Sequence, residues 1–230
     1  MPIGVVPKIL ITVLLAASSL LNSEPAFTAT ASQYLEQGLR YRASERYPEA
    51  IAALKKSVEI DPKNISGQVI LGWTQHLAGK EDAATQTLLQ AASQNLFNVP
   101  TFNALGIVFL VSGKLASAVV VHSWAAILQP DDEIAYYNLS LAHHRLKNYN
   151  SAIATANRAA ALEPSNPHPL VATAIAYWDS DNHLLAQKAY RQAINLDPRY
   201  RDRSFLTHLK QAGFSPPQIQ TAAKVLITLL

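Results

Sequence analysis

The sequence contains no cysteine among its 230 residues. This absence excludes disulfide bridges, zinc–thiolate sites, thiol catalysis and a lipoprotein-type lipid anchor. Because no thiol needs protection, the chain is able to fold in an oxidising or a reducing compartment. The absence of cysteine therefore excludes enzymes that use a catalytic thiol, and it does not indicate the compartment of the protein.

Charged residues are also few, at 15% of the chain, and the formal net charge is only +3. No long basic tract of the kind that binds nucleic acid is present, so we expect no nucleic-acid partner. Hydrophobic residues reach 49%, which is enough for a folded core and too many for a disordered chain.

Catalytic motifs are missing as well. The Gly-Lys pairs at 79–80 and 113–114 lack the upstream glycine and the hydroxyl residue of a phosphate-binding loop. The acidic run at 131–133 follows Pro130 at an expected helix start, where carboxylates cap free N–H groups. His143 and His144 are adjacent, so their side chains point to different faces of a helix. We therefore expect no enzyme activity, no cofactor and no metal site.

The N-terminus has the features of an export signal. Lys8 precedes an uncharged run at residues 9–21, and Ala29-Thr30-Ala31 resembles a cleavage site. A helix over this run spans about 20 Å, less than the roughly 30 Å hydrocarbon core of a bilayer. We interpret residues 1–31 as a signal peptide and the protein as exported, to a periplasm, a thylakoid lumen or the cell exterior. The alternatives are a membrane anchor over residues 5–21 and a buried first helix.

Internal repeats dominate the rest of the chain. A shift of 34 residues aligns two columns, which are Ala50, Ala84, Ala118, Ala152 and Ala186, and Pro62, Pro130, Pro164 and Pro198. Only Leu96 interrupts the proline column, and four prolines in one register are hard to attribute to chance, since the chain has 13. The period equals the length of one helix-turn-helix repeat, with each proline ending the second helix.

The repeats resemble the tetratricopeptide (TPR) pattern of W-x2-L-G-x2-Y, A-x3-F and P. The third repeat shows it best, with matches at Phe102, Leu105, Gly106, Phe109 and Ala118. The repeats begin at Ala31, Ile65, Val99, Glu133 and Pro167. The resemblance implies an all-α fold, a right-handed α-solenoid of about five TPR units over residues 32–198, with a concave surface.

The segment after Pro198 departs from the repeat. Ser215 and Gln218 form a capping-box pattern, and an apolar stripe follows at Ile219, Ala222, Ala223, Leu226, Leu229 and Leu230. We predict that residues 199–230 form C-terminal capping helices. The alternative is a helix that docks on a partner, on a membrane or in the protein's own groove. The basic residues of this segment are Arg199, Arg201, Arg203 and Lys210. We interpret them as a solvated face, and the alternative is a phosphate or lipid-headgroup site.

In TPR proteins the first helix of each unit lines the concave surface, and this resemblance identifies the candidate partner-binding groove. Its residues are Leu39, Arg42, Val69, Trp73, His76, Asn103, Ile107, Leu110, Tyr137, Leu141, His144, Ile175 and Trp178. The same lining extends to Leu35, His168 and Val171. The Lys and Asn clamp of chaperone-binding TPR domains is missing apart from Asn103, Asn138 and Arg42, so we do not expect that subclass. Aromatic anchors in an apolar lining favour an apolar or amphipathic helical ligand; the alternative is that these residues are buried between repeats.

The functional hypothesis is a non-enzymatic scaffold that binds a partner protein or peptide in the groove. The organisation is similar to bacterial and cyanobacterial exported or thylakoid-associated TPR proteins, some of which assist photosystem assembly. This resemblance implies a role in the assembly or maintenance of an envelope or thylakoid membrane complex, with membrane association through the N-terminal segment. The alternatives are a structural subunit of a membrane-associated complex and an accessory or regulatory domain of a separately encoded enzyme.

Overall fold

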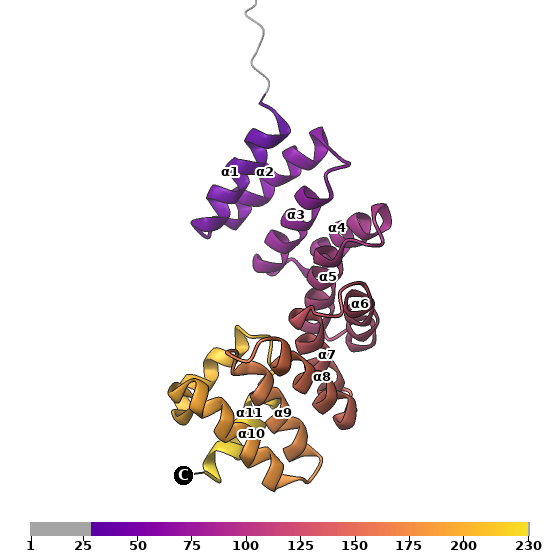
Figure 1. Ribbon diagram of the computed structural model, residues 1–230. Helices are drawn as coiled ribbons and strands as arrows, with labels where there is room; N and C mark the ends of the chain where they lie inside the picture. Colours follow the sequence, from indigo (N-terminus) through magenta and orange to yellow (C-terminus); the bar gives the residue numbers. More distant parts are fainter. Residues whose placement is uncertain (1–28, 230) are drawn as a thin grey trace, which may run out of the picture.

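The computed structural model describes residues 29–229. These residues form five helical hairpins followed by two 3-10 helices and a final α-helix. The hairpins are α1 (Ala31–Ala43) with α2 (Tyr47–Ile60), α3 (Ile65–Leu77) with α4 (Glu81–Gln94), α5 (Val99–Val111) with α6 (Leu115–Leu128), α7 (Glu133–Arg145) with α8 (Tyr149–Leu162), and α9 (His168–Asp179) with α10 (His183–Leu196). Figure 1 shows them following one another along a curved path. The predicted all-α solenoid is confirmed.

The turn inside each hairpin contains a residue in the left-handed region. Gly79 and Gly113 have φ angles of 70° and 76°, and Glu45, Lys147 and Asp181 have φ angles of 58°, 62° and 63°. These positions recur every 34 residues, so the turn keeps its geometry even where glycine is replaced. A left-handed conformation is strained for a residue with a Cβ atom. The Gly-Lys pairs are therefore turn elements of the repeat.

Small residues on the first helix of a hairpin let the second helix approach closely. A Cβ atom at Gly38 would lie 2.6 Å from Cγ of Leu54, and one at Gly72 would lie 2.6 Å from Cγ of Leu88. Both leucines are fully buried. Packing at this distance needs glycine, because any side chain would overlap its partner. The glycine–leucine pairs thus set the close approach of the two helices in the first two hairpins.

The third hairpin has a histidine where the first two have leucine. His122 lies 34 residues after Leu88 and is 0% exposed, against Gly106 of α5. Neither ring nitrogen has a hydrogen-bond partner among residues 29–229. Burial lowers the pKa of His122 from 6.5 to about 4, and the neighbouring backbone of Gly106 opposes only part of this shift. The imidazole is therefore neutral inside the core.

After the fifth hairpin the chain forms η1 (Pro198–Arg201), η2 (Arg203–Lys210) and α11 (Pro216–Ile227). α11 packs mainly against α9 and less against α10. A helix stacked as the next repeat would pack chiefly against α10, as α9 packs against α8. Figure 1 shows α11 beside α9. The C-terminal cap is present, but its last helix lies along the first helix of the fifth hairpin.

The predicted signal peptide lies almost wholly outside the described residues. Ala31 is the first residue of α1, and the N–H of Thr30 donates a 2.7 Å hydrogen bond to Oε1 of Gln33 at that helix start. Across residues 29–229, no helix has the length and apolar character that a membrane span requires.

Candidate partner-binding groove

The candidate groove lies along the first helices of the hairpins. α3, α5, α7 and α9 contact one another in order, so equivalent residues of successive repeats line one surface. Three positions in each repeat carry the lining. They are Leu35, Val69, Asn103, Tyr137 and Val171; Leu39, Trp73, Ile107, Leu141 and Ile175; and Arg42, His76, Leu110, His144 and Trp178.

The lining is open in the N-terminal repeats. Leu39, Trp73 and Ile107 occupy the same position of the repeat in α1, α3 and α5, and each is partly exposed. The flanking positions on α1 and α3 are partly exposed as well, and they are Leu35, Arg42, Val69 and His76. The row Leu39–Trp73–Ile107, which we call the open row, is accessible to a partner.

Trp73 is held in place by its neighbours. Its ring centroid lies 5.0 Å from that of His76, and the two rings are tilted by 45°. Nδ1 of His76 in turn lies 2.9 Å from Oε2 of Glu81, the first residue of α4. One part of Trp73 also packs against the buried core. A partly exposed tryptophan that is already fixed loses little side-chain entropy when a partner binds.

Asn103 belongs to the lining but is engaged within the protein. It is 9% exposed, and its Nδ2 donates a hydrogen bond to Oδ2 of Asp132. Asp132 is the N-cap residue of α7, yet its side chain makes no capping hydrogen bond. The capping predicted for this carboxylate is wrong, because Asn103 of the preceding repeat binds its oxygen instead.

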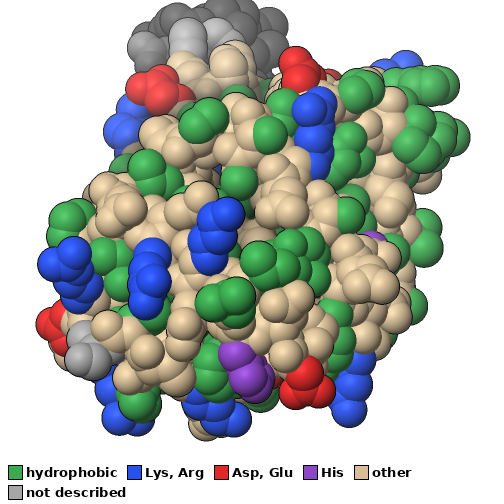
Figure 2. Space-filling view, turned by 60° about the horizontal axis from the view of Figure 1, so that its bottom comes forward, with side chains coloured by type: hydrophobic (Ala, Val, Ile, Leu, Met, Phe, Trp, Pro, Cys, Tyr) green, Lys and Arg blue, Asp and Glu red, His purple; other side chains and the backbone are tan. Residues whose placement is uncertain are grey.

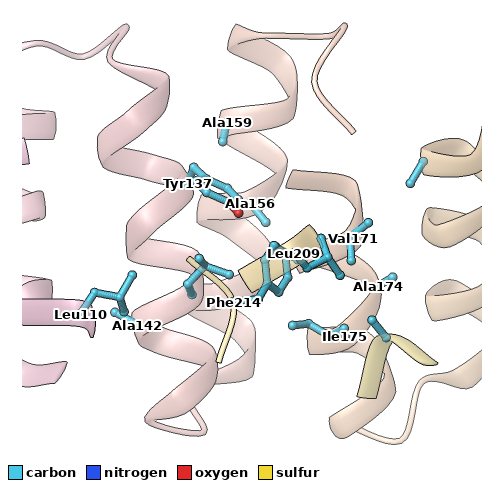
Figure 3. Packing of buried hydrophobic residues seen from close by; sticks show 14 of the residues in the cluster. Leu110, Tyr137, Ala142, Ala156, Ala159, Val171, Ala174, Ile175, Leu209 and Phe214 are labelled. Atoms are coloured by element: carbon cyan, nitrogen blue, oxygen red, sulfur yellow. The ribbon is translucent and has the colours of Figure 1, made fainter. Parts of the chain in front are cut away.

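The C-terminal part of the lining is covered by the chain itself. The segment between η2 and α11 passes over α7, where Oη of Tyr137 donates a 2.6 Å hydrogen bond to the carbonyl of Ala212. The ring of Phe214 lies 6.2 Å from that of Tyr137 between centroids and is 2% exposed. Figure 3 shows Phe214 and Leu209 among the buried residues of α7 and α9. We call residues 212–226 the covering segment.

The first turns of α11 add polar contacts to this cover. Nε2 of Gln218 donates to the Leu141 carbonyl at 3.2 Å and lies 3.3 Å from Nδ1 of His144. Nε2 of His144 lies 3.1 Å from Oδ2 of Asp179, and Oγ1 of Thr221 donates to the same oxygen at 3.3 Å. The inner faces of α7 and α9 are thus bound to the protein's own C-terminus.

The structure therefore divides the predicted groove. Its partly exposed residues are Leu39, Arg42, Val69, Trp73, His76, Ile107 and Trp178. Its buried residues, which a partner does not reach in this conformation, are Asn103, Leu110, Tyr137, Leu141, His144 and Ile175. Trp178 is separate from the open row, because it lies on α9 and its ring packs against that of His183, with the centroids 4.2 Å apart and the planes tilted by 39°.

Phe214 and Gln218 are groove-filling residues that the repeat pattern does not identify. Both lie after the last repeat, so no column of the 34-residue period contains them. The sequence signals at this place were the capping box and the apolar stripe that follows it, and the N–H of Ser215 does donate a 2.9 Å hydrogen bond to Oε1 of Gln218. The pattern located the start of α11 without showing what the helix covers.

Two histidine–carboxylate pairs lie along the groove. Within the described residues, no group of three or more His, Asp or Glu side chains is placed to hold a metal ion. The pairs His76–Glu81 and His144–Asp179 each connect a first helix to another element, at 2.9 and 3.1 Å. His76–Glu81 fixes a side chain beside Trp73 in the open row, as a preorganised binding surface requires. His144–Asp179 lies under the covering segment and holds that cover in place.

Comparison with known proteins agrees with this architecture. Tetratricopeptide-repeat models match residues 31–64 and 172–200, and a further one matches residues 103–167. BBS4 of Bos taurus, a BBSome complex member, is 26% identical over 160 residues, which covers 70% of this chain and 31% of that protein. The chain spans 22% to 34% of the length of such relatives.

Solved structures show the same fold. MamA from Desulfovibrio magneticus, residue 41 to the end, has a TM-score of 0.68 at 18% identity, covering 73% of this chain and 95% of that one. YrrB, a TPR protein with an unusual peptide-binding site, has a TM-score of 0.62 at 17% identity, covering 79% and 92%. At these identities the likeness shows the fold alone. Since the repeat models together match more than half of the chain, the protein belongs to the tetratricopeptide-repeat family.

Proposed function

We propose that this protein binds a segment of a partner protein in the open part of its groove, across α1, α3 and α5. The observation that carries the proposal is the open row, in which Leu39, Trp73 and Ile107 stay partly exposed over three successive repeats. TPR proteins act as protein–protein interaction scaffolds, and their specificity depends on the residues of the groove rather than on the fold.

The chemistry of the open row favours an apolar or amphipathic ligand. Its aliphatic and aromatic side chains are suited to bury apolar surface of a partner, and tryptophan is prominent among the anchors that dominate binding energy. Arg42 and His76 lie one helical turn further along α1 and α3 and offer hydrogen bonds beside the apolar row. A helix with an apolar stripe meets both requirements.

The setting that we propose is the assembly or maintenance of an envelope or thylakoid membrane complex, outside the cytoplasm. The signal-like N-terminus supports this setting, with Lys8 before an uncharged run. The relative BBS4 is by name a member of a larger complex, which fits a scaffold role. A structural subunit of a membrane-associated complex, or an accessory domain of a separate enzyme, would use the same groove.

Site-specific crosslinking tests the groove. A photo-reactive amino acid at Ile107 places the probe in the open row, and the same probe at the exposed residue Lys56 of α2 is the matched control. In native membranes we expect the probe at Ile107 to capture a partner that the probe at Lys56 does not reach. Equal crosslinking from the two positions, or none from Ile107, would contradict binding in the groove.

The change Trp73→Ala then measures the contribution of the anchor. We expect it to weaken partner binding by about 1 to 4 kcal/mol, the range of binding hot spots, with a small change in Tm because Trp73 is partly exposed. Trp178→Ala is the comparison variant, in which lost packing against His183 lowers Tm and leaves affinity unchanged. Calorimetric titration and thermal melts give both quantities. A Trp73→Ala variant that loses stability in proportion to affinity would make Trp73 a packing residue.

A further inference from the structure

The C-terminal end of the solenoid carries an excess of positive charge. Residues 183–230 contain seven Lys and Arg and two Asp, a net charge of +5, whereas the whole chain has +3 and the remainder therefore −2. All seven of these cationic side chains are exposed. They belong to Lys188, Arg191, Arg199, Arg201, Arg203, Lys210 and Lys224. The excess of positive over negative charge therefore lies at this end of the solenoid.

Two hollows flank α11 at this end, and each combines apolar residues with two cations. The first, of about 470 Å³, lies between η2 and α11, where Leu206, Ile219 and Ile227 stand beside Arg203 and Lys224. The second, of about 440 Å³, lies between α10 and the end of α11, where Ile194 and Leu226 stand beside Arg191 and Arg201.

The cations of the two hollows have no acidic partner. Among residues 29–229, no carboxylate lies within ion-pair distance of Arg191, Arg201, Arg203 or Lys224. Figure 2 shows Lys and Arg side chains separated by hydrophobic ones on this side of the molecule, with few acidic side chains. We call these four cations and the two hollows the basic end face.

The two aspartates of the same segment are already engaged. Oδ2 of Asp197 accepts a 2.8 Å hydrogen bond from Nη2 of Arg199, and Oδ1 of Asp202 accepts one of 2.8 Å from the N–H of Ser204 at the start of η2. Neither carboxylate neutralises the basic end face, so its positive charge is available to an anion from outside the protein.

We propose that the basic end face binds a membrane surface that contains anionic phospholipids. Phosphate headgroups complement unpaired Lys and Arg side chains, and a cluster of such cations on an amphipathic element is the pattern that anionic membranes attract. Ile227, which is 54% exposed between the cations, adds an apolar side chain that enters the boundary between headgroups and acyl chains.

The shape of the face favours a membrane over an extended polyanion. α11 separates the two hollows, so they do not join into one groove that would hold a nucleic-acid strand or an acidic helix. The described lining of both hollows also contains no aromatic side chain on which a base would stack. A fluid surface with many separate headgroups fits cations at any spacing. The open row lies on α1, α3 and α5, so a membrane at α11 leaves it accessible.

Vesicle co-sedimentation of the full-length chain tests the proposal. We expect binding to vesicles of phosphatidylcholine with about one third phosphatidylglycerol, at least about tenfold weaker binding to phosphatidylcholine alone, and loss of the difference at high salt. The N-terminal segment with Lys8 is present in the wild type and in every variant, so its own affinity for lipid cancels when the wild type is compared with the charge-reversed variants below. Equal sedimentation with neutral and anionic vesicles, or none with either, overturns the proposal.

Charge reversal locates the surface. The triple variant Arg201→Glu, Arg203→Glu and Lys224→Glu should bind anionic vesicles at least about tenfold more weakly. The matched control makes the same charge change at exposed residues of the other end, Lys55→Glu, Lys63→Glu and Lys80→Glu, and should stay within about twofold of the wild type. Circular dichroism verifies folding, and Gln replaces Glu if the reversed variant unfolds. Equal losses of vesicle binding in the two variants refute the proposal. Binding of an acidic protein to the basic end face, with no binding of vesicles, refutes it as well.

Discussion

The two ends of the inner face carry equivalent residues in different surroundings. Leu39 of the first repeat and Leu141 of the fourth occupy the same position of the 34-residue period. Leu39 is partly exposed, whereas Leu141 is 0% exposed. The difference is the covering segment, since Gln218 binds the Leu141 carbonyl and a Cβ atom at Gly213 would lie 3.5 Å from Cδ1 of Leu141. One repeat position is thus a binding residue or a core residue, depending on what covers it.

The covering segment also explains why only one end of the groove is accessible. A terminal repeat has no neighbour to bury its apolar face, so it needs a capping element. Burial of a side chain such as Ile175 or Phe214 stabilises the fold by about 1.5 to 3 kcal/mol relative to exposure. The C-terminal repeats gain this stability and lose access to a partner. The N-terminal repeats keep access and leave apolar surface exposed.

The largest expected difference in the free energy of unfolding comes from making the same change, leucine to alanine, in the covered region and in the open region. Leu141→Ala removes a fully buried side chain and should lower the free energy of unfolding by about 2 to 5 kcal/mol. Leu39→Ala makes the same chemical change at the partly exposed end and should lower it by less than about 1 kcal/mol. Urea unfolding of both variants measures the difference. Similar losses at the two positions would mean that the covering segment does not distinguish the two ends.

Periodicity is the reason that so much of the fold follows from the sequence. The predicted repeat starts at Val99 and Glu133 are the first residues of α5 and α7, and the lining positions follow from the same period. Docking of the last helix in the protein's own groove was one alternative from the sequence. Its contacts could not be predicted, because Gln218 and Leu141 are 77 residues apart and their contact depends on tertiary packing outside the repeat. The repeat alignment likewise does not predict that His122, at the position where the first two repeats have leucine, is buried, because its burial depends on the neighbouring residues.

The second prediction concerns His122, in the middle repeat between the two regions. Its folded pKa of about 4 lies below the ordinary 6.5, so the unfolded state binds more protons as the pH falls. The stability that depends on the neutral imidazole is fully present above pH 6.5 and is lost between about pH 6.5 and pH 4. We expect a loss of about 2 kcal/mol at pH 5 relative to pH 7.5, measured by urea unfolding at the two pH values.

His122→Leu restores the residue of the first two repeats and removes two buried nitrogens without partners. It should raise stability by about 1 to 3 kcal/mol at neutral pH and remove most of the loss between pH 7.5 and pH 5. Leu88→His is the matched control and should introduce the same acid sensitivity into the second repeat. A His122→Leu variant as acid-sensitive as the wild type would show that another group is responsible.

The smallest effect is expected at the hairpin turns, where the open and the covered region should behave alike. Glu45 and Lys147 have φ angles of 58° and 62°, at the position where the second and third repeats have glycine. The left-handed conformation costs a residue with a Cβ atom about 1 to 2 kcal/mol, which a change to glycine relieves. The greater freedom of glycine in the unfolded chain offsets about 0.5 to 1 kcal/mol of that relief. Glu45→Gly and Lys147→Gly should therefore each stabilise the fold by about 0.5 to 1 kcal/mol.

The variant Lys147→Ala is the control for this comparison, because it removes the side chain and keeps the Cβ atom that strains the backbone. It should give no gain in the free energy of unfolding, while Lys147→Gly gives the same gain as Glu45→Gly. A much smaller gain at Lys147 than at Glu45 would contradict a purely local origin of the strain. The turn of the covered region would then be held by its tertiary contacts, and the two ends of the solenoid would differ in their backbone as well as in their cover.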